Sequence, residues 1–107
     1  MENPRFMARV FSASERDLFA HKKDPAPSFA ANFAAKEAFS KALGTGVRGF
    51  ALNEVSVLRD SLGAPYFAFS GNAARIVEER GLSFSVSLTH TEDLAAAFVV
   101  AQPLPPG

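Results

Sequence analysis

The stretch that decides the fold reads FAAKEAFSKALGTG over residues 33–46. Ser28 precedes it and can cap a helix over residues 29–43. Gly44 is the expected C-terminal stop of that helix, because glycine adopts the left-handed conformation that helix ends favour. The stretch therefore predicts one long helix followed by a flexible turn.

Glu37 and Lys41 are the charged pair in this helix. Four residues apart, they share one face, with about 5–6 Å between their Cβ atoms. One interpretation is a surface ion pair that contributes a few tenths of a kcal/mol. The other is a ligand site, since small side chains surround the pair and leave room for close approach: Ala34, Ala35, Ala38 and Ala42. Spacing alone leaves both open.

The turn Gly44-Thr45-Gly46 also has two interpretations. Glycine lets backbone N–H groups approach an anion closely and the threonine hydroxyl adds a donor, which would suit a phosphate. A helix C-terminus, however, is the wrong end of the helix dipole for an anion. A plain C-terminal cap explains the same residues.

His90 ends a strand expected over residues 84–91, where Phe84, Val86 and Leu88 alternate with polar residues. A histidine of that parity can be a satisfied core or rim residue. It can also contact a phosphate or change its charge near neutral pH. Both interpretations are kept.

The remaining pattern predicts an α+β fold, a mainly antiparallel sheet with packed helices, in a single domain over residues 1–107. Ser12 and Glu15 have capping-box spacing at the start of a helix. The other expected elements are helices over 12–23 and 71–81, strands over 54–59, 65–70 and 94–101, and a frayed tail over 102–107.

Composition excludes several classes of protein. Eleven basic residues balance eleven acidic ones, which argues against a nucleic-acid binder that works by phosphate neutralisation. The chain has no cysteine and two histidines, so a metal would be held by carboxylates, as magnesium or calcium is. No apolar run approaches about 18 residues, so no membrane span is expected. Without a signal sequence, a cytoplasmic location is expected.

Residues 33–46 closely resemble the signature of holo-[acyl-carrier-protein] synthases, F-x-A-K-E-A-x-x-K-A-x-G-T-G. Residues 86–91 and 95–100 are similar to that family's final hairpin, and Gly63-Ala64-Pro65 resembles its G-K-P turn except at the centre. The similarity extends over nearly the whole chain, from residue 8 to residue 101.

This resemblance implies a 4'-phosphopantetheinyl transferase-like fold and Mg²⁺-dependent transfer of 4'-phosphopantetheine from coenzyme A to a serine of an apo-acyl-carrier protein in fatty acid biosynthesis. It makes Glu37 a catalytic residue and metal ligand, and Lys41 a catalytic and coenzyme-A-binding residue. It places four residues along the coenzyme A: Gly44, Thr45, Gly46 and His90. It also implies a homotrimer with each site at a subunit boundary.

Three features depart from the family pattern. The family's opening strand, G-x-G-x-D-[IL]-V, whose aspartate is another magnesium ligand, has no counterpart, and the chain begins within what should be the following helix. Asn32 and Ala64 stand where the family usually has arginine and lysine, which predicts less positive charge near the nucleotide phosphates.

Two alternatives to an active transferase therefore stay open. One is a truncated, catalytically weak or inactive relative that retains the fold. The other is a small α+β assembly module in which the Glu37–Lys41 pair is structural. For an active enzyme, Arg5, Arg9 and Arg16 are the candidate contacts to an acidic carrier.

Overall fold

A computed structural model of the chain describes residues 3–44, 46, 48–91 and 94–105. In chain order these form α1 (Pro4–Val10), α2 (Ala13–Ala20), α3 (Ala26–Leu43), the short 3-10 helix η1 (Leu52–Glu54), β1 (Val55–Arg59), β2 (Pro65–Phe69), α4 (Gly71–Glu79), β3 (Leu82–His90) and β4 (Ala95–Pro103). Across these described residues, no helix is both long and apolar enough to cross a membrane.

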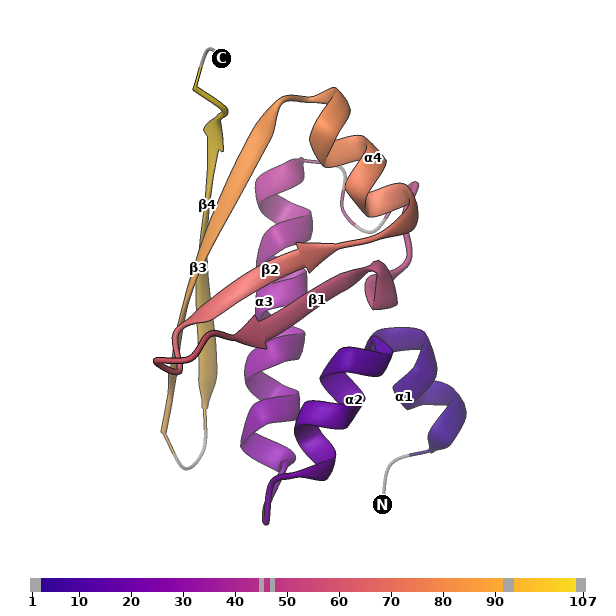
Figure 1. Ribbon diagram of the computed structural model, residues 1–107, viewed down its shortest axis with the longest axis vertical. Helices are drawn as coiled ribbons and strands as arrows, with labels where there is room; N and C mark the ends of the chain where they lie inside the picture. Colours follow the sequence, from indigo (N-terminus) through magenta and orange to yellow (C-terminus); the bar gives the residue numbers. More distant parts are fainter. Residues whose placement is uncertain (1–2, 45, 47, 92–93, 106–107) are drawn as a thin grey trace.

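Two antiparallel hairpins pack against α3, the longest helix (Figure 1). In the first, β1 pairs with β2 so that Val55 lies opposite Phe69. In the second, β3 pairs with β4 along its whole length, and this hairpin runs beside α3 (Figure 1). The predicted α+β fold with antiparallel strands is confirmed, and the strands form two separate two-stranded sheets.

The start of α3 differs from the sequence prediction. The helix begins at Ala26, so Ser28 lies inside its first turn and is not its cap. Pro27 fits this turn because the first N–H groups of a helix have no intrahelical acceptor to lose. Asp24 accepts a hydrogen bond from the N–H of Ala26 at 3.3 Å through its Oδ1. The Asp24-Pro25 break is therefore followed almost at once by helix.

The predicted capping box at the start of α2 and the predicted glycine cap at the end of α3 are confirmed. The Ser12 hydroxyl accepts from the N–H of Glu15 at 3.2 Å, and the Glu15 Oε1 accepts from the N–H of Ser12 at 3.0 Å. At the end of α3, Gly44 has φ of 86° and its N–H donates to the carbonyls of Ser40 and Lys41. A left-handed C-terminal residue of this kind favours glycine.

The prediction of a frayed tail from residue 102 is wrong for residues 102–104. Strand β4 continues through Gln102, opposite Ser83, to Pro103. The N–H of Leu104 then donates to the carbonyl of Gly81 at 2.8 Å. Pairing with β3 satisfies backbone groups that a frayed tail would leave to water.

Phe39 of α3 is wholly buried and lies at the centre of the core. Its ring centroid lies 4.8–5.6 Å from four other phenylalanine rings: Phe50, Phe67, Phe69 and Phe84. Aromatic pairs at such distances contribute about 0.5–1.5 kcal/mol each beyond the area they bury. Because these rings come from both hairpins and the loop after α3, the core fixes which face of α3 is buried.

The start of α4 is capped by a carboxylate from another element. Glu54 of η1 accepts hydrogen bonds from the N–H groups of Asn72 at 3.1 Å and Ala73 at 3.3 Å, and from that of Ala51 at 3.0 Å. The bond from Ala51 is the main cause that lowers the pKa of Glu54 below its ordinary value of 4.5. The charged form of Glu54 is therefore favoured in the folded protein.

We expect the stabilisation that this cap provides to be lost at acidic pH. A carboxyl whose pKa is lower when folded stabilises the protein above its unfolded pKa, and this contribution is lost as pH falls through the folded value. At pH 7, Glu54→Gln should lower the free energy of unfolding by up to about 1 kcal/mol, and the difference should shrink below pH 4.5. Urea unfolding at several pH values checks this, with Glu79→Gln as control. Parallel pH curves for wild type and Glu54→Gln would contradict it.

Candidate functional site

Two neighbouring sides of α3 carry the polar residues of the motif. Glu37 and Lys41 are exposed, one turn apart, whereas Asn32, Lys36 and Ser40 are buried. Lys36 and Ser40 directly precede Glu37 and Lys41. Because successive helical residues are rotated by about 100°, burying the first residue of each pair directs the second toward solvent.

The exposed pair makes no ion pair in the structure. Across the described residues, neither the Glu37 carboxylate nor the Lys41 ammonium has a hydrogen-bond or salt-bridge partner. The salt bridge found among these residues joins Lys36 to Glu15. The interpretation of the two as a surface ion pair is therefore not supported. Both charged groups stand in solvent, where a ligand can reach them.

A buried ion pair lies on the other side of the helix. The Lys36 ammonium donates to the Glu15 Oε1 at 2.6 Å, and both side chains are fully buried. The same ammonium donates to the carbonyl of Leu52 at 2.9 Å and to that of Val55. Burial lowers the pKa of Lys36, and the Glu15 carboxylate opposes that shift. All three of its N–H donors are used, so the ammonium has no capacity left for a ligand.

The Glu15 carboxylate is equally saturated. Its Oε1 also accepts from the N–H of Ser12, and its Oε2 accepts from the Asn32 amide at 2.9 Å and from the N–H of Val57 at 3.2 Å. Through these bonds, α2, α3 and the edge of β1 meet at one carboxylate. Sequence reasoning missed this network, for which the capping box at Ser12 and Glu15 was the available signal.

Asn32 belongs to this network rather than to the surface. Its amide donates to the carbonyl of Val57 at 3.0 Å, and its Oδ1 accepts from the Arg59 guanidinium at 3.0 Å. The cationic group of Arg59 thus lies beside Asn32, and the predicted loss of positive charge near the nucleotide phosphates stays a prediction. Burial lowers the pKa of Arg59, and Glu15 opposes this.

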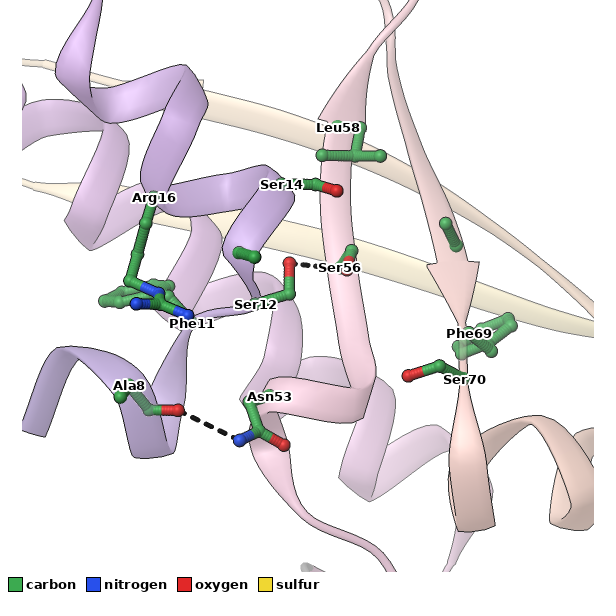
Figure 2. A pocket seen from close by; sticks show the side chains of 12 residues that line it. Ala8, Phe11, Ser12, Ser14, Arg16, Asn53, Ser56, Leu58, Phe69 and Ser70 are labelled. Carbon is green, nitrogen blue, oxygen red and sulfur yellow. Dashed lines mark hydrogen bonds between the residues drawn. The ribbon is translucent and has the colours of Figure 1, made fainter. Parts of the chain in front are cut away.

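Two cavities flank the N-terminal helices. One, of about 440 Å³, opens between the start of α2 and the outer face of β1 and β2 (Figure 2). There the Ser56 hydroxyl donates to that of Ser12 at 2.7 Å, and the Asn53 amide donates to the carbonyl of Ala8 at 2.9 Å. None of the residues predicted as catalytic, coenzyme-A-binding or metal-binding lines it, whereas Arg16, a candidate carrier contact, does.

The second cavity is an apolar groove of about 310 Å³ between α1 and the first half of α3. Its lining is Phe6, Met7, Phe11, Ala26, Phe29, Ala30 and Phe33. Phe33 lies one helical turn before Glu37, so the groove leads toward the exposed charged pair.

The sequence matches the profile of the 4'-phosphopantetheinyl transferase superfamily over residues 1–99. The chain belongs to this superfamily.

Similar proteins within the superfamily include holo-[acyl-carrier-protein] synthases. The enzyme of Aromatoleum aromaticum is 48% identical over 99 residues, 92% of this chain and 79% of the relative. That of Caldanaerobacter subterraneus is 37% identical over 101 residues, 94% of this chain and 80% of the relative. The chain thus spans about four-fifths of the length of these relatives.

Solved structures of the family confirm the fold. The holo-[acyl-carrier-protein] synthase of Neisseria meningitidis superposes with a TM-score of 0.87 at 36% identity, covering 94% of this chain and 82% of that one. The Helicobacter pylori enzyme, solved in complex with coenzyme A, gives 0.77 at 30% identity, covering 92% and 82%.

Within one chain, the predicted site residues do not all lie close together: His90 is far from Glu37 and Lys41. His90 ends β3, and Leu88, two residues before it, lines a cavity of about 200 Å³ with Ser28 in the first turn of α3. From residue 28 to Lys41 the helix rises about 20 Å. The backbone of His90, at the end of β3, therefore lies toward the start of α3, and the Glu37–Lys41 pair lies in its second half.

The loop after α3 is described in part. The N–H of Gly44 is used by the helix cap, as the plain C-cap interpretation predicts. Gly46 has a φ of 61°, which again favours glycine. Thr45 and the side chain of His90 lie outside the part of the chain that the structure describes, so their predicted contacts with coenzyme A stay predictions.

Glu37 suits a magnesium ion that a substrate helps to bind. Among the described residues, no group of three or more histidine, aspartate or glutamate side chains could hold a metal. In phosphoryl-transfer sites, however, magnesium is commonly held by one or two carboxylates together with substrate phosphates and water. The exposed carboxylate of Glu37 fits that role as a single protein ligand.

Proposed function

We propose that this protein transfers the 4'-phosphopantetheine group of coenzyme A to a serine of an apo-acyl-carrier protein. The observation that carries the proposal is the Glu37–Lys41 pair, a carboxylate and an ammonium exposed on one face of α3 and bonded to no described residue. The names of the relatives, and the coenzyme A bound in the Helicobacter pylori structure, support the choice of substrates.

The chemistry is the replacement of a phosphoanhydride bond in coenzyme A by a phosphodiester bond to the carrier serine. The serine hydroxyl of the carrier gives up its proton to water and its oxygen forms a bond to the β-phosphorus of coenzyme A. The anhydride bond from that phosphorus to the bridging oxygen breaks, and adenosine 3',5'-bisphosphate leaves. Lys41 faces the negative charge that the phosphate oxygens carry in the transition state. Glu37 would hold a magnesium ion, which when bound neutralises charge on the pyrophosphate.

A homotrimer would complete the site, because residues that lie at opposite ends of α3 in one chain can meet across a subunit boundary. The outer face of β4 supports such an interface: Phe98 is 69% exposed and Val100 is 50% exposed. Adjacent exposed apolar side chains of this kind mark an interaction surface. We place His90 of a neighbouring subunit and the Gly44–Gly46 loop against the coenzyme A.

Phe98→Asp should therefore dissociate the proposed trimer, because a carboxylate replaces an aromatic ring that the interface would bury. Light scattering after gel filtration measures the mass, and transfer activity should fall with it. Leu62→Asp is the matched control, since Leu62 is 92% exposed in the β1–β2 turn. A Phe98→Asp protein with the mass of wild type would rule out this interface.

The acidic carrier protein would dock beside α1. Arg5, Arg9 and Arg16 are exposed on α1 and α2. The apolar groove between α1 and α3, with Phe6 at its rim 46% exposed, would take apolar side chains of the carrier. Charge of opposite sign around an apolar contact speeds association and fixes orientation.

The function is tested by incubating the protein with coenzyme A, Mg²⁺ and an apo-carrier and measuring the mass of the carrier. We expect the added phosphopantetheine on wild-type carrier and none on a carrier whose serine is replaced by alanine. Chelation of the metal should stop the reaction and added Mg²⁺ should restore it. An unmodified carrier in the presence of Mg²⁺ would refute the proposal. The cytoplasmic location expected from the sequence stays a prediction.

A further inference from the structure

The buried Glu15–Lys36 ion pair lies on the side of α3 next to the exposed Glu37 and Lys41 side chains. Lys36 precedes Glu37 in the chain, and the Lys36 ammonium is held from three directions by Glu15 of α2, Leu52 of η1 and Val55 of β1. Because these three acceptors belong to three different elements, they fix the position of the Lys36 ammonium. The helix cannot turn about its own axis without breaking these bonds.

Asn32, one helical turn before Lys36, also restricts rotation of α3. Asn32 lies on the same face as Lys36, and its amide bridges the Glu15 carboxylate and the carbonyl of Val57. On the N-terminal side the ring of Phe11 lies 5.4 Å from the Lys36 ammonium. Two polar anchors one turn apart fix both the rotation and the axial position of α3 against β1.

We propose that the Glu15–Lys36 ion pair is a positioning device, which fixes the rotation of α3 and so sets the direction of Glu37 and Lys41. Lys36 and Glu15 touch no substrate, since both are fully buried. They act through the helix that carries the exposed pair. The activity readout for this inference rests on the proposed transferase function, whereas the geometric readout does not.

Kinetics provide the first test, with the neutral double variant Glu15→Gln/Lys36→Met. Misplacing catalytic groups by about 1 Å costs up to about 100-fold in rate, so kcat should fall at least about tenfold. Because Lys41 would also contact coenzyme A, the KM for coenzyme A should rise as well, by a smaller factor than the fall in kcat. Val77→Ala, a core truncation in α4, is the control: it should lower the melting temperature and leave kcat unchanged.

Asn32→Ala is a second variant for the case in which the double variant does not fold. It keeps the Glu15–Lys36 ion pair and removes the hydrogen bonds of the Asn32 amide. Its kcat should fall in the same direction by a smaller factor. A folded double variant with the kcat of wild type would overturn the proposal, and so would a Val77→Ala protein that loses kcat equally, since global stability would then explain the effect.

Spin labels provide the second test, independent of activity. Because the chain has no cysteine, labels at Glu37→Cys and Asp17→Cys report the position of α3 relative to α2 without interference. We expect one narrow distance distribution in the otherwise wild-type protein and a shifted or broadened one when Glu15→Gln/Lys36→Met is added. Identical distributions would overturn the proposal. If wild type transfers nothing, the proposed function fails while this distance still decides the positioning claim.

Discussion

Glu37→Gln is expected to lower kcat for phosphopantetheine transfer by at least about 100-fold, because it removes the carboxylate that would hold the charge-neutralising magnesium ion. The substitution keeps the size of the side chain and removes its negative charge. Glu37 is exposed and bonded to no described residue, so the fold should not change. Initial rates of carrier modification at saturating coenzyme A and Mg²⁺ measure the effect.

Glu79→Gln is the matched control for this prediction. It makes the same chemical change at an exposed carboxylate that ends α4. Its kcat should equal that of wild type. The role of Glu37 is refuted if Glu37→Gln and Glu79→Gln give the same rate while both proteins melt at the wild-type temperature.

Lys36→Met is expected to give the largest loss of stability, about 3–5 kcal/mol in the free energy of unfolding. The methionine fills a similar volume, but it leaves the Glu15 carboxylate buried without its counter-charge. It also leaves the carbonyls of Leu52 and Val55 without the Lys36 donor. Urea unfolding at pH 7 measures the loss. Lys22→Met, at an exposed position, should stay within about 0.5 kcal/mol of wild type.

In Glu15→Gln, which removes the other partner of the ion pair, we expect the free energy of unfolding to depend on pH. Burial already lowers the pKa of Lys36 from its ordinary value of 10.5, and removing Glu15 removes the charge that opposes the shift. Between the lowered folded pKa and 10.5, the unfolded chain binds more protons than the folded one. The stability of Glu15→Gln should therefore rise with pH in that window, and a deficit that grows with pH would contradict the assignment.

The fold could be predicted from the sequence where local chemistry sets it. Gly44 and the Ser12–Glu15 capping box mark helix ends through short-range hydrogen bonds, which a sequence displays directly. The start of α3 was misplaced because Ser28 looked like a cap, although proline suits the first turn equally well. The extent of β4 was underestimated because its last residues are held by pairing with β3, a partner that the local sequence does not reveal.

The candidate site could be predicted only in its exposed half. The spacing of Glu37 and Lys41 shows that they share a helix face, and the structure confirms that this face is open to solvent. Lys36 and Glu15 are twenty-one residues apart, and nothing local indicates that a lysine beside a glutamate is fully buried. That outcome follows from tertiary packing, which turns one side of α3 toward the core.

The most direct test of the central claim is a crystal structure of the protein with coenzyme A and Mg²⁺. We expect the Glu37 carboxylate at about 2.0–2.1 Å from a magnesium ion and the Lys41 ammonium within hydrogen-bond distance of a coenzyme A phosphate. Coenzyme A bound elsewhere, with both side chains still in bulk solvent, would contradict the assignment of this site.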